Sequence, residues 1–98
     1  MNKFDLITFK ESKVPKGIWA KIDFPNGWSA SIVKNDVSYG GKMGLFEIAV
    51  LDKKGDISSE TDITDDVLGW LDERKVEKTL DAIRLLDEKG KLPEGVTL

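Results

Sequence analysis

The sequence predicts an α+β fold: an antiparallel β-meander of three to four strands with two C-terminal helices packed on one face. Apolar residues alternate at the strand period up to about residue 57 and follow the helical period beyond it. Glycine-containing turns separate the alternating segments, which favours consecutive antiparallel pairing. The 98 residues suit a single domain, with strands over about 4–58, helices over about 64–89 and a loose tail at 91–98.

The central hairpin is predicted together with its register. A two-residue Asn-Gly loop would place Phe24 opposite Ser29, whereas the three-residue loop 25–27 places Phe24 opposite Trp28. Only the longer loop gives one continuous apolar face, because a slip of one residue would invert every side chain. Glycine also suits the left-handed bulge position of such a loop, so Gly27 is expected there.

The other strands follow from the same alternation. Residues 45–51 form the next strand, with Phe46, Ile48 and Val50 turned to the core. A turn at 52–56 leads into a short strand at Ile57-Ser58, and an early strand is expected at residues 4–9. Residues 10–17 are interpreted as a basic loop.

Two helices are expected after residue 63. Thr64 is a suitable N-cap, with Asp65 and Asp66 in the first turn, where the helix dipole favours acids. Asp72 caps a second helix over 73–89, and Gly90 suits its C-terminal end. The resulting core comprises Ile18, Ile22, Phe24, Trp28, Ile32, Phe46, Ile48, Val50, Leu68, Leu71, Leu80 and Ile83.

Composition excludes several kinds of chemistry. The chain has neither cysteine nor histidine, which removes thiol nucleophiles, the usual general base and zinc sites built from these residues. We therefore expect no enzyme activity, no catalytic residues, no metal and no cofactor. No stretch of about 18 apolar residues predicts a membrane span, and no signal peptide is evident, which favours a cytoplasmic location.

The outer face of the predicted sheet carries a partly apolar patch. The hairpin register places Trp19 opposite Val33 on the side away from the helices. One interpretation is that the amino-terminal strand or the carboxyl-terminal tail covers this patch. The other is a surface that binds a protein partner or a second copy in a homodimer, for which tryptophan is a typical anchor.

A glycine-rich stretch, SYGGKMG at residues 38–44, raises the question of a phosphate site. A phosphate loop needs a helix after its glycines, whereas a strand follows here, so a long hairpin connection is favoured. If the loop is functional, Tyr39, Lys42 and Met43 are expected to contact a partner. The alternative is a small nucleotide- or nucleic-acid-binding module that uses this loop and the N-terminal lysines, which the net charge of −3 disfavours.

Acidic residues form a third candidate surface. Asp62, Asp65 and Asp66 lack the spacing of a calcium loop, and helix capping explains part of the group. We include all three among the residues expected to bind a protein partner.

The pieces NGW, SYGG-x-x-GLFE and ITDDV-x-G-x-L are the most distinctive of the chain. Over about residues 17–86 it resembles small accessory proteins encoded by bacteriophages and prophages, from which no functional residues carry over. The resemblance implies a viral protein that acts in the cytoplasm of a bacterial host by binding a host protein. By analogy, its target would be a host defence system such as CRISPR-Cas.

Overall fold

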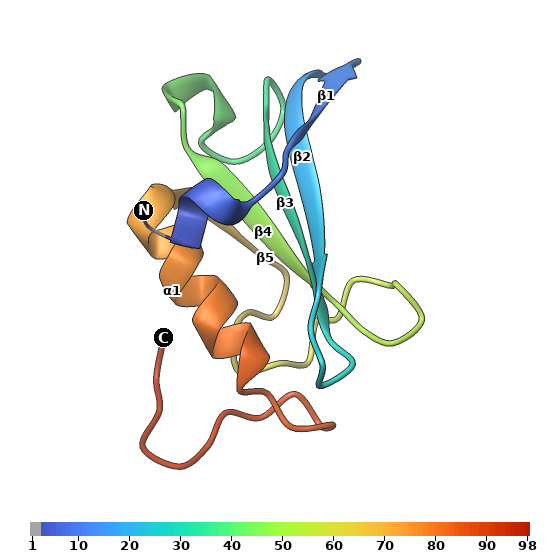
Figure 1. The fold of residues 1–98 in the computed structure, drawn as a ribbon, viewed down its shortest axis with the longest axis vertical. Helices are drawn as coiled ribbons and strands as arrows, with labels where there is room; N and C mark the ends of the chain where they lie inside the picture. Colours follow the sequence, from blue (N-terminus) through green and yellow to red (C-terminus); the bar gives the residue numbers. More distant parts are fainter. Residues whose placement is uncertain (1–2) are drawn as a thin grey trace.

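The computed structural model describes residues 3–98 and confirms the α+β class (Figure 1). Five antiparallel strands form one sheet in the order β1-β2-β3-β4-β5. The strands are β1 (Lys10–Lys13), β2 (Lys16–Asp23), β3 (Ser29–Asn35), β4 (Phe46–Leu51) and β5 (Val67–Leu71). One α-helix, α1 (Glu73–Arg84), follows them, and two short 3-10 helices lie at η1 (Lys3–Leu6) and η2 (Gly41–Met43). The meander therefore has one or two more strands and one fewer α-helix than predicted.

The central hairpin has the predicted register. Ala20 lies opposite Ile32, and Ile22 lies opposite Ala30. The loop closes with a hydrogen bond from the Phe24 amide to the Trp28 carbonyl, 2.9 Å long. Gly27 has a φ of 92°, which is the left-handed conformation expected at the bulge.

The amino-terminal segment differs from the prediction. Residues 4–9 form η1 and an irregular stretch instead of a strand, because Phe4 and Phe9 both pack against the ring of Phe46, at centroid distances of 5.3 and 5.5 Å. Residues 10–13 of the expected basic loop form β1, which pairs with β2. A strand of charged residues is tolerated at the edge of a sheet, where its charges discourage pairing with other chains.

Residues 64–71 were expected to form a helix, and this prediction is wrong. Val67–Leu71 is β5, and Thr64 accepts a hydrogen bond from the amide of Asp66 instead of capping a helix. Leu68 and Leu71, three apart, both reach the core because the pairing with β4 shifts by one residue between Phe46 and Ile48. A β-bulge thus reproduces the spacing that indicated a helix.

The C-terminal helix begins as predicted but ends earlier. The Asp72 side chain accepts a hydrogen bond from the Lys75 amide at 2.8 Å, so it is the N-cap. The helix ends at Arg84, and Gly90 lies in a following turn instead of at the helix end. Ile57 makes a single bridge to Leu51 instead of a strand.

The core lies between the sheet and α1. All residues predicted for the core lie in it or pack against it. Residues that the sequence analysis did not include are Ala30, Ile63, Val76, Ala82 and Leu86. Figure 1 shows α1 and the amino-terminal segment on the same side of the sheet, which we call the inner side. No helix within residues 3–98 has the length and apolarity needed to cross a membrane.

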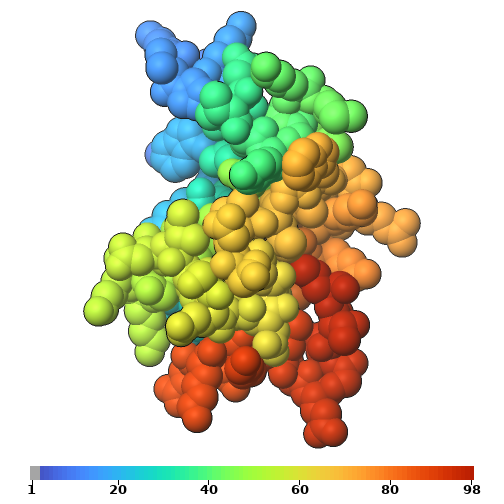
Figure 2. Space-filling model, turned by 180° about the vertical axis from the view of Figure 1, so that it is seen from behind, coloured from blue at the N-terminus to red at the C-terminus, as the bar shows by residue number. Residues whose placement is uncertain are grey.

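The opposite, outer side of the sheet is only half covered. Within residues 3–98, the amino-terminal segment packs on the inner side, where Phe4 and Phe9 contact Phe46, and Leu92 of the carboxyl-terminal tail packs against the core. Figure 2 shows residues 52–66 over the lower part of this side, where Ala49 and Leu51 are each only 8% exposed. The upper part, formed by the ends of β2 and β3 and the loop after β3, stays open to solvent.

Candidate functional site

A row of side chains crosses the upper part of the outer side. The register aligns Lys10 with Trp19, Trp19 with Val33, and Val33 with Glu47, one residue from each of β1 to β4. The indole of Trp19 is 39% exposed, and the Lys10 ammonium lies 5.4 Å from its ring centroid. This distance is within the range of a cation–π contact.

A pair of aromatic rings, those of Tyr39 and Trp70, continues this row toward β5. The rings of Tyr39 and Trp70 lie 5.4 Å apart between centroids, tilted by 35°. The Trp70 amide donates a hydrogen bond to the Tyr39 carbonyl at 3.1 Å. The Glu47 carboxylate accepts a hydrogen bond of 3.3 Å from the Tyr39 amide, which connects the pair to the row. We call Trp19, Val33, Tyr39 and Trp70 together the aromatic surface.

Trp70 is held in a conformation that its residue type disfavours. Its φ of 53° is the only positive φ of a non-glycine residue within the described residues 3–98. The left-handed region costs an L-residue about 1–2 kcal/mol, and the cost is greatest for bulky side chains. Trp70 is nevertheless 54% exposed, and Tyr39 is 53% exposed. The chain therefore accepts backbone strain in order to present a tryptophan to solvent.

The glycine-rich loop shapes this surface by close packing. A Cβ on Gly69 would lie 2.4 Å from the Cβ of Tyr39, and one on Gly41 would lie 1.8 Å from the carbonyl oxygen of Asn35. Both glycines are needed because backbone and side chain approach too closely for any larger residue. Gly40 and Gly44 supply positive φ values of 88° and 79°.

The amides of the same loop are largely used within it. Those of Gly41, Met43, Gly44 and Leu45 all donate to loop carbonyls, and that of Tyr39 donates to Glu47. Few N–H groups remain for an anion, so the loop geometry matches a hairpin connection better than a phosphate cradle. Lys42 and Met43 are exposed on the loop, with Met43 at 74%.

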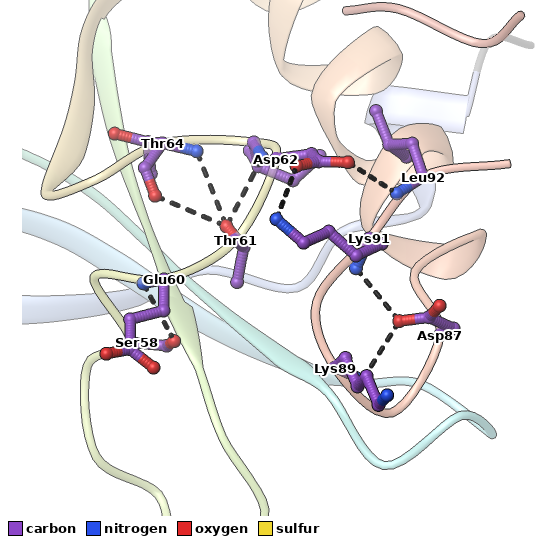
Figure 3. A network of polar contacts seen from close by, with 10 residues as sticks. Ser58, Glu60, Thr61, Asp62, Thr64, Asp87, Lys89, Lys91 and Leu92 are labelled. Atoms are coloured by element: carbon purple, nitrogen blue, oxygen red, sulfur yellow. Dashed lines mark hydrogen bonds and ion pairs between the residues drawn. The ribbon is translucent and has the colours of Figure 1, made fainter. Parts of the chain in front are cut away.

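Of the three acidic residues predicted to bind a partner, Asp62 belongs to a network of polar contacts within the chain, which Figure 3 shows, whereas Asp65 and Asp66 are exposed. Asp62 connects the segment before β5 to the tail: its carboxylate accepts from the Leu92 amide at 2.9 Å and pairs with Lys91 at 3.5 Å. Its amide donates to the Gly90 carbonyl. Asp65 and Asp66 are exposed at the start of β5, whereas Trp70 lies near its end. Leu92 packs on the core, so the start of the tail is held in place instead of loose.

Two carboxyl groups have shifted pKa values, and both lie outside the aromatic surface. The amide of Lys91 donates to Asp87 and, with that of Lys89, lowers the pKa of this carboxyl. The Ser29 hydroxyl, 2.6 Å from Asp23, and the nearby Lys21 ammonium lower the pKa of Asp23. Hydrogen bonds to the charged form explain both directions.

Within residues 3–98, neither the acidic side chains nor the amino-terminal lysines gather into one binding site. Within residues 3–98, no three acidic side chains are grouped closely enough to hold a metal ion. The amino-terminal lysines are dispersed: Lys3 pairs with Asp81 on α1, Lys10 lies over Trp19, and Lys21 pairs with Asp23.

Comparison with known proteins finds no matching family model, no matching curated protein and no matching solved structure.

The structure thus brings together only some of the predicted site residues. Trp19, Val33 and Tyr39 lie on one surface, whereas Asp62 binds Lys91 and Leu92 of the tail. Sequence reasoning missed Trp70 because it placed residues 64–71 on a helix. The glycine directly before this tryptophan was the available signal, since glycine inside a strand often marks a bulge or a close backbone approach.

Proposed function

We propose that this protein is a non-catalytic binding module that docks on a protein partner through its aromatic surface. The observation that carries the proposal is Trp70, a bulky residue in left-handed conformation whose ring is half exposed. Glycine or asparagine would satisfy the backbone at less cost, so fold stability alone does not account for tryptophan. A strained residue at a surface is typical of a functional site.

The composition of the surface supports a protein as the partner. Tryptophan and tyrosine dominate the binding energy of protein interfaces, because they bury a large area with few rotatable bonds. Trp19 and Trp70 lie toward opposite ends of the row, and Val33 and Glu47 lie between them. Lys10 and Lys42 are exposed at the periphery, so the surface has charged residues at its rim, as protein interfaces do.

The biological setting follows from the resemblance to accessory proteins of bacteriophages and prophages. In that setting the partner is a bacterial protein, the compartment is the host cytoplasm, and the effect is inhibition of a host defence system such as CRISPR-Cas. The lack of histidine and cysteine in the whole chain supports action by binding and not by catalysis.

A capture experiment tests this proposal. Tagged wild-type protein, Trp70→Gly and Trp19→Ala are used to isolate partners from bacterial host lysate, with Leu85→Ala as the control. Leu85 is 49% exposed, similar to Trp70, but lies at the end of α1. We expect a stoichiometric partner with wild type and Leu85→Ala, and loss of about tenfold or more with Trp70→Gly. No partner with wild type, or equal capture by all four proteins, would refute the proposal.

A further inference from the structure

We propose that the aromatic surface recognises a cationic side chain of its partner, arginine before lysine, seated between the Tyr39–Trp70 rings and the Glu47 carboxylate. This inference rests on the proposed function and specifies the chemistry of the same surface. It follows from three features that lie together: two exposed aromatic rings, a carboxylate beside them, and the lack of an internal cation for that carboxylate.

Glu47 is a negative charge without a cationic partner among residues 3–98. Ion pairs in this part of the chain join Lys3 to Asp81, Lys21 to Asp23 and Lys91 to Asp62. The contact of Glu47 is instead a hydrogen bond from the Tyr39 amide, which uses one carboxylate oxygen. The other oxygen has no partner within the described chain, although the side chain is half-buried.

The cation on the row is already engaged. Lys10 lies over the indole of Trp19, and its strand β1 is three strands away from β4, which carries Glu47. Lys34 follows Val33 on β3, so its side chain points to the inner side of the sheet. Its ammonium lies there 4.9 Å from the ring centroid of Phe46. The ion pairs within residues 3–98 leave Glu47 out, and Lys42 on the neighbouring loop is exposed without an ion pair to it, so we expect the complementary charge to come from the partner.

Arginine fits this arrangement better than lysine does. Its guanidinium is flat, stacks on aromatic faces and presents several N–H donors in its plane to a carboxylate. The two rings pack against each other, and both residues remain about half exposed, at 53% for Tyr39 and 54% for Trp70. The hydrogen bond that the Tyr39 amide donates to Glu47 holds the carboxylate at the backbone of the residue that carries one of these rings.

The same features select among classes of partner. A phosphate backbone would be repelled by Glu47, so nucleic acid is disfavoured at this surface. A second copy could bring Lys10 to Glu47, but its ammonium would first have to leave the ring of Trp19. An arginine on a protein partner satisfies both the charge and the rings without breaking an internal contact.

The test follows the indole N–H signals by NMR, which number three because the chain has three tryptophans. The Trp70 signal is assigned by its loss in Trp70→Gly. N-acetyl-arginine methylamide is the probe, and the uncharged N-acetyl-citrulline methylamide is its control. We expect the arginine probe to shift the Trp70 signal selectively, and Glu47→Gln to weaken its binding about two- to fivefold. The matched variant Glu88→Gln, exposed just before the tail, should bind as wild type does.

Three results would overturn the inference: equal shifts from citrulline and arginine, unchanged binding by Glu47→Gln, or a Trp70 signal that moves only with protein concentration. The last result would indicate that a second copy occupies the surface. The proposed function fails separately, because its failure is the absence of a captured partner. If Trp70→Gly loses the partner while Glu47→Gln keeps it fully, the surface binds protein but does not read a cation.

Discussion

Replacing Asn26 tests how the central hairpin is joined to the helix. Its side-chain amide nitrogen lies 2.9 Å from the carbonyl of Ile83, 3.0 Å from that of Arg84 and 3.1 Å from that of Leu86. Its oxygen accepts from the Trp28 amide at 3.1 Å. The hairpin loop therefore caps the carboxyl end of α1, where the last carbonyls have no partners within the helix.

The loss of stability expected from replacing Asn26 follows from the hydrogen bonds that its side chain makes. The amide group has two hydrogens for three carbonyls, so the capping is equivalent to about two hydrogen bonds, each with a net value of about 1 kcal/mol. Asn26→Ala removes these bonds and also the bond from the Trp28 amide, so we expect it to lower the free energy of unfolding by about 3 kcal/mol and the Tm by about 12–24 °C. Urea denaturation measures the first quantity, with the m-value unchanged.

Asn26→Asp is the matched control, because it keeps the oxygen for Trp28 but removes the donors. The bond that it keeps is worth about 1 kcal/mol, whereas its negative charge facing the carboxyl end of the helix dipole costs about 0.3–1 kcal/mol. We therefore expect its stability at neutral pH to lie within about 1 kcal/mol of that of Asn26→Ala and well below that of wild type. A loss below about 0.5 kcal/mol in Asn26→Ala, or an aspartate variant as stable as wild type, would exclude this capping of α1 by Asn26.

Two further predictions concern the site and the acid response. Gly69→Ala should lower the free energy of unfolding by about 2–3 kcal/mol and displace Tyr39, because the new Cβ would lie 2.4 Å from that side chain. Gly44→Ala is the control: its φ is 79° and the space around it is open, so it should lower the same quantity by only about 1 kcal/mol. Equal losses for the two variants in urea denaturation would contradict this prediction. Because the folded-state pKa values of Asp23 and Asp87 lie below the ordinary 3.8, their stabilisation is complete above that value and is lost as the pH falls through the lowered pKa values. Asp87→Asn should therefore flatten the loss of stability below about pH 4, and an unchanged pH profile would exclude this role.

The sequence predicted those parts of the fold in which local signals agree. At the central hairpin, the alternation of apolar residues and the turn residues 25–27 specify one register, and the structure has it. At residues 64–71 the capping residue Thr64 and the three-residue spacing of Leu68 and Leu71 are typical of a helix, whereas Val67–Leu71 is a strand. A bulge opposite Phe46 and Ile48 accommodates the same spacing in a strand, and it depends on contacts distant in sequence.

The candidate site was predicted in part for the same reason. Trp19 and Val33 follow from the hairpin register alone. Trp70 reaches Tyr39 only because β5 joins the sheet and the loop after β3 folds over it. The unpaired charge of Glu47 likewise depends on where every lysine of the described chain comes to lie.

We propose that the Tyr39–Trp70 pair serves contact with a partner and not the stability of the fold. The free energy of unfolding of Trp70→Gly distinguishes these two roles. Relief of about 1–2 kcal/mol of left-handed strain offsets the lost ring contact and the added backbone entropy, so we expect a value within about 1 kcal/mol of wild type. Phe46→Ala, at a site only 4% exposed, provides the scale of a structural aromatic, about 3–5 kcal/mol. A loss of that size from Trp70→Gly would contradict the claim.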